Sequence, residues 1–593
     1  MAPPAANSKL FARASLFVIG LAWTLPFLQP FHRLPVAGFY SEWLAIALGM
    51  AAALLLLCSQ PWREAEMPVV AIAPIGLIVV LGLQVLLEFG PYAEQVLTAV
   101  LYLMWALLLI LLGHVLKREL TLPAVATTLA WFLLVGGALS AAIGILQHYH
   151  VLAVAGIPIL QKVGPEIYGN LGQANHFATY LAMAQACAVY LFGRGRLRVS
   201  WFVASAVVLL PPLAMSGSRS PWLYLIALAI LASLLYQRVR NAESRRLAIV
   251  TLMLLPGFAI AQLVLLIPVA APDHVGQITS ADRMFHVASG LERRLQLWWE
   301  SWQMFLDAPL LGAGYGQFAW HHFLATASNA GSVAPDVFNH SHNIVLQLLA
   351  ETGAIGTGIV VAPLLLWLVD LRRCMFVAER WWLLALTAVI GIHSMLEHPL
   401  WYSYFLGMAA LILGSGAERN FLLRNSDVVR AMVALAIIIG WLNVATVLPP
   451  YREFERLVFA PVRGTAKQVD EESFARAISR LYREPLLVPY VDLAVAINVT
   501  VSEDNLKDKL LLTARAVRFI PLPAACYRYA LLLALAGERE AALVQLDRSL
   551  RAYPAEVGDV VVQLDMLARS NPEVFAPMLE LTRAVSKRSL GSR

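Results

Sequence analysis

The chain has 593 residues, of which 59% are hydrophobic and 14% are charged, and its mean hydropathy is +0.68. Soluble domains usually contain about 45–50% apolar and about 25% charged residues, so this composition excludes a soluble protein over most of the length. It indicates a polytopic membrane protein. The net charge of +6 follows from how basic residues are distributed around the membrane, and it gives no reason to expect nucleic acid as a partner.

Apolar segments long enough to cross a bilayer, which takes about 20 residues, recur from the N-terminus to residue 450. They predict an all-α chain with about 13 transmembrane helices, of which the seventh and the twelfth are the shortest. The predicted helices are centred near residues 20, 50, 78, 104, 133, 184, 206, 228, 258, 356, 389, 408 and 440.

The loops between these segments alternate in charge, and the positive-inside rule then gives their direction. With the N-terminus in the cytoplasm, every second loop is basic, and the opposite short loops carry only Arg33, Lys162 and Arg219. This alternation places the loop 271–342 and the tail from 451 outside the cytoplasm. The basic loops carry Arg63; Lys117 and Arg118; Arg194, Arg196 and Arg198; Arg238, Arg240, Arg245 and Arg246; Arg372, Arg373 and Arg380; and Arg419, Arg424 and Arg430.

The tail differs from the rest of the chain, because charged residues are frequent there and apolar residues return at helical spacing. The segment Ala525–Pro554 predicts a helical hairpin with Gly537 at its turn, and its later helix keeps the spacing of a tetratricopeptide repeat. Such repeats usually bind partners through a concave face. We therefore expect four regions: an N-terminal bundle of about nine spans (1–270), an extracytoplasmic loop with active-site residues (271–342), about four further spans (343–450) and a TPR-like helical domain (451–593).

The hexapeptide Phe338–Asn343, with the sequence FNHSHN, ends the long loop and opens an apolar helix. It brings His340 and His342 to the mouth of a predicted span. Histidine gains or loses a proton near neutral pH, so this boundary is suited to chemistry on a lipid-linked substrate.

Arginines lie on the same predicted side, as Arg219 in a short loop and as Arg293 and Arg294 in the long loop. The planar guanidinium offers several fixed donors and keeps its charge, so arginines from separate loops suit a diphosphate group. The structural alternative is an anchor at lipid headgroups or a solvated loop charge. The extracytoplasmic loops contain no Asp-x-Asp pair to hold magnesium, so we expect no metal and no cofactor.

Other polar residues are candidates for binding substrate. Gln173 and Asn175 precede the sixth span, and Glu397 and Tyr402 lie between the eleventh and the twelfth. Glu351 is the most deeply placed acid of any predicted span, and acids inside membranes are functional candidates. The alternatives are helix capping for the two amides and a structural hydrogen bond for Glu351.

A cluster of tryptophans in the long loop, Trp298, Trp299 and Trp302, predicts an amphipathic helix that lies in the membrane interface. We interpret these tryptophans as packing residues and do not assign them to substrate stacking. The remaining histidines of the loop, among them His321 and His322, are interpreted as ordinary interfacial residues.

Several of these segments together resemble the bacterial O-antigen ligase and polymerase superfamily. They are RLQLW at Arg294–Trp298, APLLGAGYG at Ala308–Gly316, and the spaced set His342, Asn343, Gln347, Glu351 and Gly353. Within the superfamily, the chain is most similar to the O-linked protein glycosylation ligases, also called pilin glycosylation ligases or O-oligosaccharyltransferases. The matching segments are GNLGQANHFATY at Gly169–Tyr180, Pro35 with Phe39–Glu42, and EHPLWY at Glu397–Tyr402.

The resemblance implies an inner-membrane glycosyltransferase of C-type architecture whose active site faces the periplasm. Such enzymes move a preassembled oligosaccharide from undecaprenyl diphosphate to a hydroxyl, which in the protein branch is a serine or threonine of a pilin or another periplasmic protein. The family roles carry over to His342 as the essential histidine and to Arg219 and Arg294 as diphosphate contacts. Arg293 and His340 are alternatives to their neighbours.

Four other functions are alternatives. A ligase that transfers O-antigen to lipid A-core, or an oligosaccharide polymerase, has the same donor chemistry, but the helical tail and the block from Gln173 to Asn175 favour the protein branch. A membrane transporter would usually show internal repeats or ionisable groups at the midplane, whereas this sequence has no internal repeat and its polar residues cluster on one membrane face. A scaffold that acts only through its tail would not need arginines and histidines on the outer side.

Overall fold

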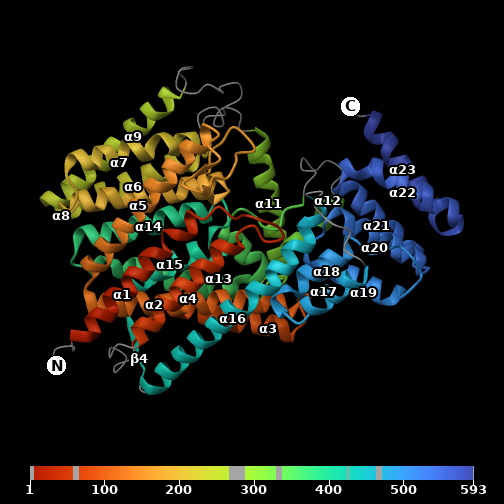
Figure 1. Cartoon of the computed structure of the whole chain (residues 1–593), viewed down its shortest axis with the longest axis horizontal. Coiled ribbons are helices and arrows are strands. Elements are labelled where there is room, and N and C mark those ends of the chain that lie inside the picture. Colours follow the sequence, from red (N-terminus) through yellow and green to blue (C-terminus); the bar gives the residue numbers. More distant parts are fainter. Residues whose placement is uncertain are drawn as a thin grey trace. The chain divides into compact units, whose positions relative to one another are not determined.

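The structure is a computed structural model that describes residues 6–57, 66–265, 288–328, 337–423, 426–462 and 471–591. Parts of the predicted long loop, 271–287 and 329–336, lie outside the described residues, as do Arg63 and Arg424. Within these ranges the chain is all-α apart from two short β-ribbons, with 22 α-helices (Figure 1). One ribbon pairs β1 (Glu66–Pro68) with β4 (Asn420–Leu422), and the other pairs β2 (Ala153–Val154) with β3 (Ile157–Pro158).

The chain divides into two compact units, and each is built from separate stretches of sequence. The first comprises Met1–Gly76, Tyr102–Val287 and Ile359–Thr446; the second comprises Leu77–Leu101, Ala288–Gly358 and Val447–Arg593. Four long helices have residues in both units: α3 (Ile72–Leu86), α4 (Ala93–Leu120), α13 (Ile344–Asp370) and α16 (Ser426–Val462). The domain boundaries expected from the sequence stay a prediction.

The first unit is organised around one helix, α6 (Ala174–Gly193), which is apolar on all sides and buried from His176 to Leu191. An all-round apolar helix is typical of the centre of a bundle. α6 packs against α5, α7, α8, α9 and α14. The other helices of this unit are α1 (Ala6–Ala22), α2 (Phe39–Leu57), α5 (Leu122–His148), α7 (Val199–Met215), α8 (Ser220–Val239), α9 (Ala242–Val264), α14 (Val377–Ser394) and α15 (Ser403–Ser415).

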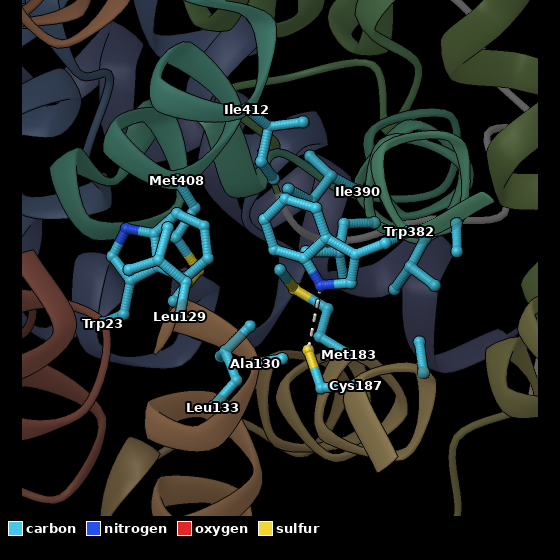
Figure 2. Close-up of a cluster of buried hydrophobic side chains, with 14 of the residues drawn as sticks. Trp23, Leu129, Ala130, Leu133, Met183, Cys187, Trp382, Ile390, Met408 and Ile412 are labelled. Carbon is cyan, nitrogen blue, oxygen red and sulfur yellow. Dashed lines mark hydrogen bonds between the residues drawn. The ribbon is translucent and has the colours of Figure 1, made fainter. Parts of the chain in front are cut away.

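Large side chains fill the core beside α6 (Figure 2). The Trp382 ring is fully buried, and its Nε1 donates a hydrogen bond to Cys187 Sγ at 3.4 Å. The Trp23 ring lies 6.4 Å from the Trp382 ring at an interplanar angle of 20°. Elsewhere in the unit, α4 and α15 cross at glycines: a Cβ at Gly414 would lie 2.0 Å from the Ile110 carbonyl oxygen. Small residues allow such close backbone approach between membrane helices.

The second unit contains α11 (Ala288–Asp307), α12 (Phe318–Ser328) and the helices of the tail. α12 packs against α11 and against α19 and α21 of the tail. The tail helices are α17 (Glu471–Leu481), α18 (Val488–Ala496), α19 (Leu506–Phe519), α20 (Pro523–Leu535), α21 (Arg539–Ala552), α22 (Val557–Ser570) and α23 (Pro572–Gly591). Short 3₁₀ turns in the two units are η1 (Leu25–Phe27), η3 (Val69–Ala71), η4 (Gly169–Leu171), η6 (Leu371–Arg373), η7 (Pro399–Trp401), η8 (Pro485–Leu487) and η9 (Pro554–Glu556).

The predicted hairpin of the tail is formed by α20 and α21, which pack together with Gly537 at a φ of +81° between them (Figure 1). Glycine adopts this left-handed conformation without strain. The further assignment to tetratricopeptide repeats stays a prediction.

Each of the predicted apolar segments contains a helix in the structure. Among the described residues, nine helices are long and apolar enough to cross a membrane, and α7 and α15 are shorter apolar helices of 17 and 13 residues. The chain is therefore a polytopic membrane protein, and the two short helices are the ones that the sequence marked as shortest. The count of about 13 spans stays a prediction.

Candidate active site

The predicted site residues divide between the two units. Arg219, Gln173, Asn175, Glu397 and Tyr402 belong to the first unit, and Arg293, Arg294, His340, His342 and Glu351 belong to the second. The geometry of each group follows separately.

The segment before α6 is held by two buried amides, Gln147 and Asn170. Gln147 Oε1 accepts hydrogen bonds from the backbone N–H groups of Tyr168 (2.9 Å) and Gly169 (3.0 Å). Asn170 Nδ2 donates to the Leu28 carbonyl at 3.0 Å, and its Oδ1 accepts from the Leu160 N–H at 3.1 Å. The hydrogen-bond partners of Gln147 are distant in the sequence, so no local sequence pattern predicts its role. These bonds fix the chain that leads into Gln173.

Gln173 is the N-cap residue of α6, but its side chain makes no capping hydrogen bond. Its Oε1 is buried and has no hydrogen-bond partner among the described residues. Asn175 Nδ2 instead donates to Glu397 Oε1 at 2.9 Å. Helix capping, the structural alternative for these two amides, is thus not what their side chains do.

A buried network lies one turn further into α6. Thr179 Oγ1 contacts the Asn175 carbonyl oxygen, Tyr224 Oη and His393 Nδ1, each at 2.9 Å. A hydroxyl has one hydrogen to donate, and the carbonyl can only accept it. Tyr224 Oη and His393 Nδ1 must therefore both donate to Thr179 when all three bonds are made, which assigns the Nδ1–H tautomer to His393.

His176 lies beside this network and faces the predicted Tyr402. The two rings are 4.7 Å apart at 81°, and the His176 and His393 rings are 5.4 Å apart. Both histidines are buried, and the Nε2 atom of each has no hydrogen-bond partner among the described residues. His176 lies within the Gly169–Tyr180 motif, which could have pointed to it as a site residue. No sequence motif contains His393.

Arg219 lies directly before α8 in a turn of buried serines. Ser216, Ser218 and Ser220 are buried, whereas the Arg219 side chain is exposed. Gly217 has a φ of +65°, which makes the tight turn possible. The N-terminus of a helix attracts anions because its N–H groups and dipole point outward. Arg219 therefore extends from a position that already favours negative charge.

In the second unit, the loop before α13 holds His342 in a left-handed conformation with a φ of +54°. This conformation is uncommon outside glycine, and strained residues of this kind cluster at functional sites. Ser341 N–H donates to Gln347 Oε1 at 2.7 Å, and Asn343 Oδ1 accepts from Val345 N–H (3.1 Å) and Leu346 N–H (3.2 Å). Asn343 thus caps α13 and fixes the turn that presents His342.

Arg293, the alternative to Arg294, and the predicted base His342 share one aromatic neighbour, Phe338. The Arg293 guanidinium carbon lies 5.4 Å from the centre of the Phe338 ring, and the His342 ring lies 5.8 Å from it. The His340 and His342 rings are 4.1 Å apart. Arg294, the next residue on α11, is half-buried.

Glu351 is buried beneath the glycine-rich segment Ala308–Gly316. Its Oε1 accepts from the Phe318 N–H at 3.2 Å, and its backbone carbonyl accepts from Gln84 Nε2 at 2.7 Å. A Cβ at Gly312 would lie 2.4 Å from the Thr352 backbone nitrogen, so only glycine allows this contact. These bonds support the structural alternative for Glu351, and a role in substrate binding stays a prediction.

Comparisons with known proteins match segments that contain the predicted site residues from Gln173 to Tyr402. Residues 204–361 match the family described as O-Antigen ligase, residues 167–192 match Protein glycosylation ligase, and residues 381–564 match Virulence factor membrane-bound polymerase, C-terminal. A general O-oligosaccharyltransferase of Acinetobacter baylyi is 26% identical over 405 residues, which are 67% of this chain and 68% of that protein.

A ComP-specific O-oligosaccharyltransferase of the same organism is 25% identical over 258 residues, which are 43% of this chain and 44% of that protein. Along the sequence, the protein glycosylation ligase match comes first, followed by the O-antigen ligase match and then the polymerase match. The chain is therefore similar to the O-antigen ligase superfamily and is a homologue of glycosyltransferases of the O-oligosaccharyltransferase type, as its motifs predicted.

Proposed function

We propose that this chain is an O-linked protein glycosylation ligase of the bacterial inner membrane. It transfers a preassembled oligosaccharide from undecaprenyl diphosphate to serine or threonine hydroxyls of a pilin or another periplasmic protein. The active site faces the periplasm, within about 13 spans of C-type arrangement and beside a TPR-like tail. The names of the two Acinetobacter relatives support the class of reaction.

One observation carries the proposal: a guanidinium and an imidazole lie against the same Phe338 ring, at 5.4 Å and 5.8 Å. A fixed cation beside a group that can accept a proton is what displacement of a diphosphate by a hydroxyl requires. The left-handed turn at His342 agrees with a functional role for that residue, because strained residues of this kind cluster at functional sites.

The proposed reaction forms a bond between the acceptor oxygen and the anomeric carbon and breaks the bond from that carbon to the diphosphate oxygen. The hydroxyl proton passes to His342, which acts as base or orients the hydroxyl. The diphosphate leaves on its lipid, and Arg219 and Arg294 offset the charge that it gains. Direct displacement of this kind inverts the anomeric configuration. The donor lipid reaches the site from the bilayer.

The amide and carboxyl groups of the first unit are assigned to the sugar. Gln173 Oε1 is buried without a partner among the described residues, so it can accept a hydrogen bond from a sugar hydroxyl. Asn175 and Glu397 are bonded to each other, and we assign this pair and Tyr402 to the wall of the same sugar site. No metal enters the proposal, because cationic side chains take its place.

The test is co-expression of the chain with a lipid-linked glycan pathway and a candidate pilin, in a host without a ligase of its own. Mass spectrometry should find glycan on the pilin, and His342→Ala should remove it. Transfer by purified protein should continue in excess EDTA. Glycan on lipopolysaccharide with an unmodified pilin would overturn the choice of acceptor.

An oligosaccharide polymerase is the second candidate, and the match of residues 381–564 to the membrane-bound polymerase family favours it. A polymerase would lengthen the lipid-linked glycan even when no pilin is present. Gel analysis of the lipid fraction from the same cells therefore separates the two functions.

A further inference from the structure

α11 carries a buried acid, Glu300, on the face of the helix that also holds Arg293. Arg293, Leu297, Glu300 and Met304 recur at helical spacing and lie on one face of the helix. Glu300 is only 7% exposed, and its Oε1 accepts a hydrogen bond from Gln296 Nε2 at 3.0 Å. A carboxylate this deeply buried is unfavourable unless it is paired.

The partner of Glu300 is His322 on α12. His322 Nδ1 lies 2.5 Å from Glu300 Oε2, and His322 is 1% exposed. The pair joins α11 to α12 across 22 residues of sequence. No sequence motif predicted a role for either residue, since Glu300 lies within a tryptophan-rich segment and His322 was interpreted as an ordinary loop histidine.

The His322 ring connects this pair to the candidate active site. It is stacked on Phe318, with centroids 6.1 Å apart at 14°, and lies 5.9 Å from the Phe338 ring. Phe338 is the residue that contacts both the Arg293 guanidinium and the His342 ring. A continuous set of contacts therefore runs from the Glu300 carboxylate to the predicted cation and the predicted base.

We propose that Glu300 and His322 are positioning residues that set where the Arg293–Arg294 pair stands relative to His342. The proposal rests on the proposed function, because it concerns the same site. A short buried hydrogen bond fixes the rotation of α11 about its axis, and this rotation decides where both arginines point. Phe338, held by His322 on one side, fixes the loop that carries His342.

We expect the Glu300–His322 pair to define the orientation of α11 more than it increases the stability of the fold. Buried ion pairs often add little to folding free energy compared with apolar residues of similar size, because both charges lose their hydration. An apolar replacement should therefore keep the fold but lose the defined geometry. A misplacement of about 1 Å can lower a rate by about 100-fold, so the effect should appear in kcat.

The experiment compares two variants of the full chain, purified in lipid nanodiscs and supplied with a polyprenyl-diphosphate oligosaccharide and its acceptor. His322→Asn keeps an N–H close to the position of Nδ1 and should retain kcat within about threefold, since the hydrogen bond survives. His322→Phe keeps the ring but removes the donor, and should lower kcat by about 10- to 100-fold with little change in KM.

Two controls separate positioning from folding. The double variant Glu300→Met with His322→Phe should keep a Tm near that of the wild type while kcat stays low. Asp565→Asn removes the anionic partner of Arg583 on the exposed tail surface, 2.9 Å away, and should change neither quantity. In a His342→Ala background, His322→Phe should slow the residual reaction no further, because His322 acts through the position of His342 and the effects of residues that act together do not add.

Equal kcat for His322→Phe and wild type would overturn the proposal. So would losses of rate that follow losses of Tm across the variants. If the wild type glycosylates lipid A-core and leaves the protein unmodified, the proposed acceptor is wrong. The comparison of His322→Asn with His322→Phe, measured on that lipid acceptor, still decides the role of the pair.

Discussion

At the scale of single residues, His342 combines a strained backbone with a ring that lies against His340 and Phe338. We predict that His342→Ala lowers glycan transfer by about 10²- to 10⁴-fold, as loss of a general acid–base group does. His340→Ala should be milder, because Asn343 caps α13 directly after His342 and fixes that residue. Initial rates of transfer to the pilin measure both. An inactive His340→Ala beside an active His342→Ala would move the role to His340.

The backbone at His342 adds a second readout for the same position. A left-handed residue other than glycine costs about 1–2 kcal/mol, and glycine avoids that cost. His342→Gly should therefore be as inactive as His342→Ala but have a higher Tm. Equal Tm values would show that the turn does not strain this residue.

The arginines are predicted to act through their shape as well as their charge. Arg219→Lys and Arg294→Lys should both reduce transfer strongly, because lysine cannot make the forked contact to a diphosphate. Transfer rates measured at several donor concentrations should show the loss mainly in kcat if the contact between arginine and diphosphate strengthens as the diphosphate leaves. Wild-type rates in both lysine variants would assign these residues to membrane anchoring.

At the scale of elements, Thr179 joins α6, α8 and α14 with one hydroxyl. Thr179→Val keeps the shape but leaves the Tyr224 hydroxyl and His393 Nδ1–H buried without their acceptor. Each unpaired donor costs about 1–3 kcal/mol, so the Tm of the purified protein should fall. Thr179→Ser, which keeps the hydroxyl, should stay near the wild type. A Tm for Thr179→Val as high as that of Thr179→Ser would refute the hydrogen-bond assignment.

Much of this element structure could be predicted from the sequence, and α11 shows where prediction stops. Three tryptophans at close spacing indicated an amphipathic helix, and in α11 Trp299 and Trp302 are exposed while Leu297 and Met304 are buried. The spacing of apolar residues thus predicted the helix and distinguished its buried face from its exposed face. The partner of Glu300 lies on another helix, and no local pattern encodes that pairing. The same is true of Gln147, whose four hydrogen bonds depend on how the chain returns to α5.

At the scale of the whole molecule, the tail is part of the second unit and is tied to the chain between α3 and α4. Tyr92 Oη and Tyr482 Oη each donate to Asp492, at 2.7 Å, and Arg515 lies 4.5 Å from the centre of the Tyr92 ring. Burial and the neighbouring Asp492 carboxylate raise the pKa of the Tyr92 hydroxyl, so it stays a donor at neutral pH.

We predict that Asp492→Ala loosens this attachment, because the buried Tyr92 hydroxyl and the Tyr482 hydroxyl both lose their acceptor. Limited proteolysis of the purified protein should then cut the tail several times faster than in the wild type. Asp565→Ala, on the exposed side of the tail, is the matched control and should leave the rate unchanged. Equal rates for Asp492→Ala and wild type would show that the remaining apolar contacts hold the tail alone.

The membrane orientation is the last property of the whole molecule, and side-chain pairing in the first unit agrees with the alternation of loops from which it was predicted. Loops predicted to share the cytoplasmic side are paired with one another: Lys117 with Glu418 at 2.9 Å, Arg194 with Glu243 at 3.0 Å, and Arg419 with Asp370 at 2.6 Å. The pairing of β1 with β4 joins one further loop of that predicted side, which contains Glu66, to the loop that carries Arg419.

Residues predicted to lie outside pair among themselves as well, as Asn175 with Glu397 and His32 with Asn170. Helices that alternate in direction bring alternate loops to the same side, which agrees with this pairing. Which side is cytoplasmic stays a prediction from the basic loops. Alkaline phosphatase fused after residue 460 should be active, because the tail would lie in the periplasm, whereas a fusion after Arg196 should be inactive. The reverse result would place His342 in the cytoplasm, where it would be separated from any periplasmic acceptor, and would rule out the proposed reaction.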